Sequence, residues 1–421
     1  MDDHAAPAAS LSPGALVRAR WGIGLIFFVN GAAFASWVSR IPALRAGLEL
    51  GDGTLGSVLF AMSRGVLLSF PLAGKGAQLL GARQLALLAG VALLLMLPMP
   101  FLVGILPSLV LVMLEVGAAL GTMQVAMNVL AVDVQSRVTR PIMSSLHGAW
   151  SAGGLVGAGV GSLAAHAALS PLLHLAGAGV ALGALLLLAL VLLAGARLPA
   201  RAGATPRPSM SFRPPSLRGD RALLGLGVIC LCAFLVEGAL ADWSAVWLHD
   251  HASASESQAA LGYAVFAGAM TTMRLVGDRV LEVFGTVRVL RVLTALGAAA
   301  LAGALLLARV DGALLAFVLL GLGMATVVPS AFAAAGRRAH ALTGGATGEA
   351  PAARAVALLS GFGYSGLLLG PPLIGWLAQA TTLTWALGLL VLLVAAIVAL
   401  VPLLGGRGQR RLASQEVVVT G

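Results

Sequence analysis

The chain has 421 residues, of which 59% are hydrophobic and only 10% are charged, against roughly 25% charged residues in a typical globular protein. This composition excludes an ordinary soluble domain and indicates a protein built from membrane-spanning helices. The formal net charge of +10 does not indicate nucleic-acid binding, because the basic residues lie between apolar runs and form no continuous stripe.

Twelve apolar runs are long enough to cross a hydrocarbon core of about 30 Å as helices. We expect spans at 18–39, 54–72, 84–106, 108–131, 142–165, 170–194, 222–247, 258–276, 287–308, 312–335, 354–378 and 382–404. Pro329 and the pair Pro371-Pro372 fall inside these runs, and we expect them to break their helices locally.

The basic residues are distributed asymmetrically. All but four of the 26 lysines and arginines fall on one side of the predicted spans; Arg40, Arg45 and Arg309 fall on the other side, and Arg64 lies within a span. We expect an inner-membrane protein, and by the positive-inside rule both termini are expected to be cytoplasmic and the number of spans even. Residues 1–17 do not have the pattern of a cleavable signal peptide.

The longest polar break, 195–221, is rich in arginine and proline. Such a segment cannot bury a core, so it is expected to be a cytoplasmic linker. It separates an N-terminal six-helix bundle, 1–194, from a C-terminal six-helix bundle with a short cytoplasmic tail, 222–421. The predicted fold class is therefore an all-α membrane protein in two six-helix halves.

The two halves share short patterns in the same order. A Leu-Gly pair is followed by a Phe-Ala pair in the second and eighth spans, and an aromatic–Ser pair is followed by closely spaced glycines in the fifth and eleventh. These matches are Leu55-Gly56 with Leu261-Gly262, Phe60-Ala61 with Phe266-Ala267, and Trp150-Ser151 with Tyr364-Ser365. Two parallel six-helix repeats indicate a transporter whose substrate site lies at the repeat interface.

The stretch 74–83 resembles the loop signature of the major facilitator superfamily, Gly-x-x-x-Asp-(Arg/Lys)-x-Gly-(Arg/Lys)-(Arg/Lys), although glutamine replaces the acidic residue. The resemblance implies that this loop and its second-half copy latch the halves together by charge pairs, more weakly in the first copy. The gating residues that it implies are Gly74, Gln78, Gly81, Arg83, Asp278 and Arg279.

Three further strings, 35–42, 140–151 and 237–244, resemble the bacterial permease group typified by YbjJ and MosC. The resemblance covers nearly the whole chain and implies a secondary transporter of the major facilitator fold. It also implies a small polar solute of sugar, polyol or aminocyclitol type as the substrate.

Ionisable residues inside spans are costly, so each is a functional hypothesis. Arg64 and Glu115 lie at depths that allow an intramembrane ion pair, which is either structural or functional. Gln124 and Asn128 share one face of the fourth span, about 180° from Glu115. We expect the two amides to bind substrate and Glu115 to be a structural partner, although the reverse assignment also fits the spacing.

The first span places Asn30, Phe34 and Trp37 on one stripe. An amide beside aromatic rings suits a sugar-like ligand, whereas the alternative is a packing stripe with a buried, hydrogen-bonded asparagine. The resemblance implies that spans 1, 4, 7 and 10 line the cavity.

Glu237 lies deep in the seventh span and is the predicted proton-coupling carboxylate. Asp242 is the second proton-coupling candidate and is expected to pair or cap near the outer end, and Trp243 joins the predicted substrate-binding set. His147 is a candidate proton relay, with a hydrogen-bonded interhelix histidine as the alternative.

We find no P-loop, zinc-protease or nucleophile-elbow string, so we expect neither an enzyme nor a cofactor or metal site. Cys230 and Cys232 are expected to fill the core.

The expected partners are a small-molecule substrate, protons and the lipid bilayer, with the chain a monomer. The leading function is a secondary transporter of a small polar solute that works by alternating access, either coupled to protons or facilitative. The alternatives are an exporter of amphipathic compounds and a non-transporting membrane receptor or scaffold.

Overall fold

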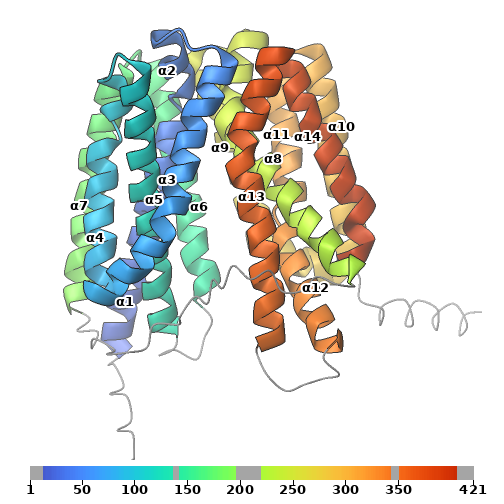
Figure 1. Ribbon diagram of the computed structural model, residues 1–421, viewed down its shortest axis with the longest axis horizontal. Coiled ribbons are helices and arrows are strands. Elements are labelled where there is room, and N and C mark those ends of the chain that lie inside the picture. The colour runs from blue at the N-terminus through green and yellow to red at the C-terminus, as the bar shows by residue number, and fades with distance from the viewer. Residues whose placement is uncertain (1–12, 136–141, 196–219, 343–349, 405–421) are drawn as a thin grey trace, which may run out of the picture. The chain divides into compact units, whose positions relative to one another are not determined.

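The computed structural model describes residues 13–135, 142–195, 220–342 and 350–404 (Figure 1). These residues form helices and connecting turns, and no strand occurs among them. The α-helices before the predicted linker are α1 Pro13–Val38, α2 Ile41–Gly47, α3 Asp52–Leu79, α4 Ala82–Met96, α5 Leu106–Gln135, α6 Met143–His166 and α7 Pro171–Gly195. Those after it are α8 Arg221–His251, α9 Glu256–Phe284, α10 Thr286–Leu307, α11 Val310–Met324, α12 Val327–Leu342, α13 Ala350–Ala380 and α14 Leu383–Leu400.

The helices confirm the predicted all-α membrane fold. Eleven helical stretches of the described residues are long and apolar enough to cross a membrane. The twelfth expected span, 142–165, coincides with the 24-residue helix α6. Hydropathy therefore located the spans, because a run of apolar side chains is stable in lipid only when its backbone is hydrogen-bonded within a helix.

The prolines that were expected to break two of the spans have different effects. Helix α11 ends at Met324 and α12 begins at Val327, so the predicted break near Pro329 is present. The predicted break at Pro371-Pro372 is wrong, since α13 continues through both prolines. A short helix that we did not predict, α2, begins with Pro42 in its first turn, where the missing proline N–H has no helical partner to lose.

The internal repeat is visible in the backbone. Gly81 separates α3 from α4 with φ 83°, and Gly285 separates α9 from α10 with φ 81°. Both lie in the left-handed region that glycine adopts without a steric penalty. Two spans on each side of the predicted linker are therefore joined by the same tight connection.

Corresponding aromatic pairs also occur on both sides of the linker. The Phe34 and Trp150 rings stack at 6.4 Å between α1 and α6, and the Phe234 and Tyr364 rings lie 6.2 Å apart between α8 and α13. Glycines allow each helix pair to approach closely: a Cβ on Gly153 would meet a carbonyl oxygen of α1 at 2.1 Å. Small residues permit such contacts in membranes.

The chain divides into two compact units. The first comprises Met1–Trp37, Arg64–Gly157 and Leu169–Pro206. The second comprises Val38–Ser63, Ala158–Ala168 and Arg207–Gly421, so it combines the C-terminal helices with short segments from before the linker. The expected bundles 1–194 and 222–421 therefore stay a prediction. The expected linker lies almost entirely outside the described residues.

Candidate functional site

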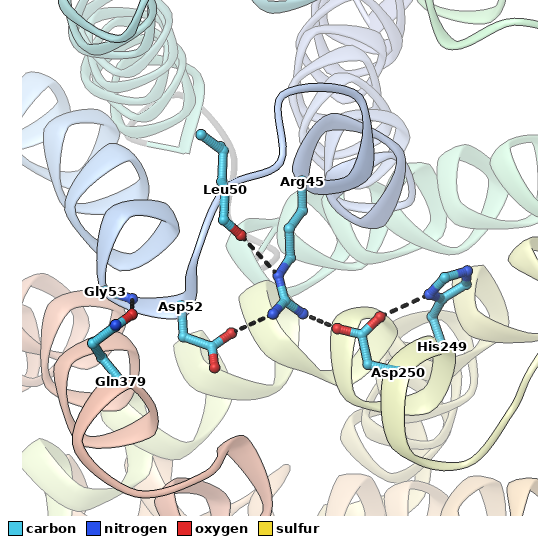
Figure 2. Close-up of polar contacts among 7 residues, drawn as sticks. All are labelled: Arg45, Leu50, Asp52, Gly53, His249, Asp250 and Gln379. Carbon is cyan, nitrogen blue, oxygen red and sulfur yellow. Dashed lines mark hydrogen bonds and ion pairs between the residues drawn. The ribbon is translucent and has the colours of Figure 1, made fainter.

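An ionic cluster lies in the second unit at the helix ends predicted to face outward (Figure 2). Arg45 of α2 donates through Nε to the Leu50 carbonyl oxygen at 3.2 Å. One terminal nitrogen of its guanidinium lies 2.8 Å from Oδ1 of Asp52, and the other donates to Oδ2 of Asp250. His249 Nδ1 lies 2.8 Å from the second Asp250 oxygen. Arg45 thus connects the start of α3 to the end of α8.

Helices α3 and α13 meet beside this ionic cluster. The Gly53 N–H donates to Oε1 of Gln379 at 3.2 Å (Figure 2), and Trp376 Nε1 donates to the Ser57 hydroxyl at 3.3 Å. A Cβ on Gly56 would lie 2.9 Å from the backbone of α13, so these two helices touch through main chain. Polar side-chain contacts therefore surround a close backbone crossing.

Arg40 makes a further ionic contact at the helix ends predicted to face outward. It is only 1% exposed and lies 3.6 Å from Oε2 of Glu256 at the start of α9. Burial of a guanidinium is tolerated when a carboxylate compensates it. Sequence reasoning placed Arg40 and Arg45 on the outer side but missed this set of contacts. The available signal was the concentration of charged residues where the predicted spans end.

Two carboxylates on α8 form an inner cluster with α9. The Tyr263 hydroxyl lies within electrostatic range of Glu237, Asp242 and Arg274. Neither carboxylate forms a hydrogen bond or ion pair with any residue that the structure describes. The two predicted proton-coupling residues thus share one neighbourhood, although they lie on different faces of α8.

Trp243 and Ser244 continue α8 beyond Asp242. Trp243 is fully buried and Ser244 is 1% exposed. The indole Nε1 and the hydroxyl have no hydrogen-bond partner within the described chain. Trp243 was predicted to bind substrate; because its side chain is fully buried, this role stays a prediction.

Asn30 connects three helices of the first unit. Its Oδ1 accepts a 3.0 Å hydrogen bond from Trp150 Nε1, and its Nδ2 donates to the Leu120 carbonyl oxygen at 3.5 Å. The side chain is completely buried. This arrangement matches the packing alternative for the α1 stripe, because both functional groups of the amide bind protein atoms.

The two aromatic residues of that stripe also pack within the first unit. Phe34 stacks on Trp150, and Trp37 lies edge-on to Phe101 at 6.3 Å. Trp37 is 1% exposed and its Nε1 has no partner in the described chain.

The two predicted amides of α5 differ from each other. Asn128 donates to the Gln124 carbonyl oxygen one turn earlier at 2.8 Å, so its amide is partly used. The Gln124 side chain is half-buried and makes no hydrogen bond to a described residue. Gln124 is therefore the predicted substrate residue of this helix whose amide remains available.

The predicted Arg64–Glu115 ion pair is not formed. Glu115 has no ion-pair partner among the described residues, and both side chains are exposed. Helices α3 and α5 meet through Gly65, whose Cβ would lie 2.0 Å from the Leu114 carbonyl oxygen. This contact turns the next residue, Glu115, about 100° away from α3 and into a groove against α4.

His147 is exposed on α6 and packs edge-on against Phe27 at 5.3 Å. This contact agrees with the interhelix alternative for His147. No group of three or more His, Cys, Asp or Glu side chains that could hold a metal occurs in the described residues.

Residues 23–350 match the sequence model of the Major Facilitator Superfamily. The chain belongs to the major facilitator superfamily. It is 36% identical to an uncharacterized MFS-type transporter of Yersinia pestis, over 89% of this chain and 93% of that protein. It is 32% identical to the membrane protein MosC of Rhizobium meliloti, over 89% of this chain and 86% of MosC.

Solved structures of this superfamily share the fold. The nucleoside transporter NupG aligns with a TM-score of 0.66 at 15% identity, covering 92% of this chain and all of NupG. A bacterial homologue of the lysosomal transporter Spinster aligns with a TM-score of 0.65 at 16% identity, covering 93% and 95% of the two chains. The chain is accordingly a membrane transporter of the major facilitator fold.

The major facilitator signature lies mostly within helices rather than in a loop. Gly74 and Gln78 are in the last turns of α3, Gly81 forms the connection, and Arg83 is in the first turn of α4. Asp278 and Arg279 lie within α9, before Gly285. None of the four polar side chains makes an ion pair with a described residue. Their latching role stays a prediction, and the neighbouring segments 136–141 and 343–349 lie outside the described residues.

Proposed function

We propose that this transporter carries a small polar solute of sugar, polyol or aminocyclitol type by alternating access, coupled to protons through Glu237. The observation that carries the proposal is the state of the two α8 carboxylates. Glu237 and Asp242 lie in a membrane-spanning helix near Tyr263, and neither forms an ion pair or hydrogen bond with a described residue, the neighbouring Arg274 included.

An uncompensated carboxylate in a low-dielectric site is costly, so it is neutralised by a proton or by a cationic ligand. A carboxylate that gains and loses a proton as its cavity changes sides couples transport to the proton gradient. Glu237 has the deeper position in α8, 14 residues before the helix ends at His251. Asp242, five residues nearer that end, is the second candidate.

Substrate contacts are assigned to side chains that remain available. Gln124 of the first unit offers an amide that makes no hydrogen bond to a described residue. Asn30 and Trp150 are assigned a supporting role, because they satisfy one another. A ligand with several hydroxyl groups matches such donors and acceptors, since a few polar groups fix its orientation.

The outer contacts of Arg40, Arg45 and Gln379 fit alternating access. They join segments from before the linker to α8, α9 and α13, and in this mechanism they break when the outer side opens. We also propose that both termini lie in the cytoplasm of a bacterial cell. Labelling of a single cysteine at position 210 in intact cells by an impermeant reagent would contradict that orientation.

The decisive experiment begins with a thermal-shift screen of the purified protein against polyols, sugars and aminocyclitols, because a ligand that binds only the folded state raises its stability. The ligand found is then used in proteoliposomes with an imposed pH gradient. We expect Glu237→Gln to exchange the solute across the membrane but not to accumulate it. Glu282→Gln, the same change at an exposed site on α9, is the control and should accumulate it normally.

If Glu237→Gln transported the solute uphill as well as the unchanged protein, Glu237 would not be the proton-coupling residue. Asp242→Asn would then be the next variant to test. Loss of binding itself by Glu237→Gln would indicate that the carboxylate neutralises a cationic solute rather than a proton.

A further inference from the structure

A groove of about 460 Å³ runs between α4 and α5 in the first unit. On each of the two helices, the residues that line the groove lie three or four positions apart and therefore share one face. The lining residues are Leu88, Ala89, Ala92, Met96, Glu115, Ala118, Ala119 and Thr122. Four alanines account for the hollow, because short side chains leave the space between the helices unfilled.

The groove opens toward the membrane. Leu88 lines it and is 59% exposed, and Leu95 of α4 and Leu111 of α5, one turn or less along the helices from lining residues, are 61% and 57% exposed. In a helix that crosses a bilayer, such exposed leucines contact lipid chains. The opposite side of α5 faces α1, where the Leu120 carbonyl oxygen accepts from Asn30. The groove is therefore separate from the face of α5 that packs on α1.

Among the residues that the structure describes, Glu115 is the only ionisable one that lines this groove. It is nine residues into α5, roughly 14 Å along the helix axis. It has no hydrogen bond or ion pair to a described residue. A carboxylate at this depth is costly and marks a ligand or ion site by default. Thr122, two turns later on the same stripe, adds a hydroxyl to the same groove.

We propose that this groove binds a hydrophobic organic cation that enters from the membrane, with Glu115 as its counter-ion. The charge complements the unpaired carboxylate, and the apolar body contacts Leu88, Met96 and the alanines. A volume of about 460 Å³ lies within the range of sites for drug-sized ligands. The flexible Met96 side chain adapts to ligands of different shape. This site is independent of the α8 carboxylates and of the proposed solute.

The test uses tetraphenylphosphonium, a permanent hydrophobic cation, and triphenylphosphine oxide, a neutral compound with similar rings. Binding of each to the purified full-length protein in detergent is measured by calorimetry. We expect the cation to bind and the neutral compound to bind at least about tenfold more weakly. Glu115→Gln should weaken cation binding by a similar factor, because it removes the charge and retains the size.

Two further variants locate the site. Ala119→Leu fills the groove and keeps the charge, so it should also weaken binding, while Glu237→Gln should leave it unchanged. Glu115→Gln removes no partner interaction, and we expect its melting temperature to equal that of the unchanged protein.

Three results would overturn the proposal. If the cation bound equally well to the unchanged protein and to Glu115→Gln, Glu115 would not be its counter-ion. Loss of binding in Glu237→Gln alone would place the cation at α8. Absence of cation binding, together with a change of oligomeric state in Ala119→Leu, would make the groove a contact between copies of this chain. Unchanged uphill solute transport in Glu237→Gln, which would contradict the proposed coupling role of Glu237, affects none of these results, so the two proposals fail separately.

Discussion

The Arg45 guanidinium lies 2.8 Å from Oδ1 of Asp52 at the start of α3. The same guanidinium also donates a hydrogen bond to Asp250 at the end of α8. The three side chains are between 17% and 30% exposed. One cation thus joins two carboxylates from opposite sides of the predicted linker, at helix ends that have to separate if the outer side opens.

We expect Arg45→Gln to favour opening of the outer side, because it leaves Asp52 and Asp250 without their shared partner. In a background without Cys230 and Cys232, labelling of a cysteine at position 57 by an impermeant thiol reagent should become roughly three- to tenfold faster, which corresponds to about 0.7–1.4 kcal/mol. Arg309→Gln is the matched control, since the Arg309–Asp311 pair is largely exposed and such pairs contribute little.

A double variant that exchanges the charges at positions 45 and 250 tests whether the ion pairs restore slow labelling. Arg45→Asp combined with Asp250→Arg places an arginine near Asp52 and should bring the labelling rate back toward that of the unchanged protein. Labelling that is equally fast in the exchanged protein and in Arg45→Gln would contradict the role of the ion pairs.

Asp220 should make the stability of α8 depend on pH. Its carboxylate caps α8 by accepting from the Ala222 N–H at 2.9 Å and the Leu223 N–H at 3.4 Å, and it accepts from Arg338 Nε at 2.7 Å. Burial raises the pKa of Asp220, but the hydrogen bond from Arg338 and those from the two amides outweigh this effect and hold the pKa below its usual value.

A carboxyl group whose pKa is lower in the folded state stabilises the protein fully above its unfolded pKa of about 3.9. That contribution is lost as the pH falls through the folded pKa. We expect Asp220→Ala to lower stability at pH 7 by about 1 kcal/mol through loss of the cap. Asp220→Asn should cost less, because asparagine also caps helices. Melting temperatures in detergent at pH 7 and pH 3 should differ less for either variant than for the unchanged protein, and an equal difference would contradict the linkage.

Gly65 should be the most sensitive small residue of the α3–α5 contact. A Cβ at this position would lie 2.0 Å from the Leu114 carbonyl oxygen, whereas a Cβ on Gly177 of α7 would meet no atom within 4 Å. Gly65→Ala should therefore destabilise the protein by about 1–3 kcal/mol. Gly177→Ala should be neutral or stabilising by up to about 1 kcal/mol. Thermal unfolding followed by circular dichroism compares them, and equal effects would show that the helices are not in close contact at Gly65.

Asn30 should act on stability rather than on substrate selection. Asn30→Ala leaves the half-buried Trp150 N–H without its acceptor, which costs about 1–3 kcal/mol. Trp150→Phe removes the donor as well as the need for it, so the double variant should be less destabilised than the sum of the two single variants. A weaker affinity of Asn30→Ala for the solute at unchanged stability would instead support the original substrate-binding prediction.

The sequence by itself determined the membrane character, the positions of the spans and the family. The expected run 170–194 and the helix Pro171–Gly195 agree within a residue at each end. These properties are local, because the hydropathy of a run of about 20 residues decides whether it spans a membrane. The motif 74–83 likewise identified the superfamily although most of it is helical.

Only the tertiary structure decided which side chains meet. Depth along each helix was readable from the sequence, so Arg64 and Glu115 were placed at compatible heights. The rotation of one helix against another was not readable, because it depends on where close-approaching glycines such as Gly65 lie opposite a partner backbone. That rotation separates Glu115 from Arg64, satisfies both groups of the Asn30 amide, and leaves Gln124 available. The same physical reason explains the Arg45 cluster, because Asp250 is about 200 residues from Arg45 and Asp52 and meets them only when α2, α3 and α8 pack together.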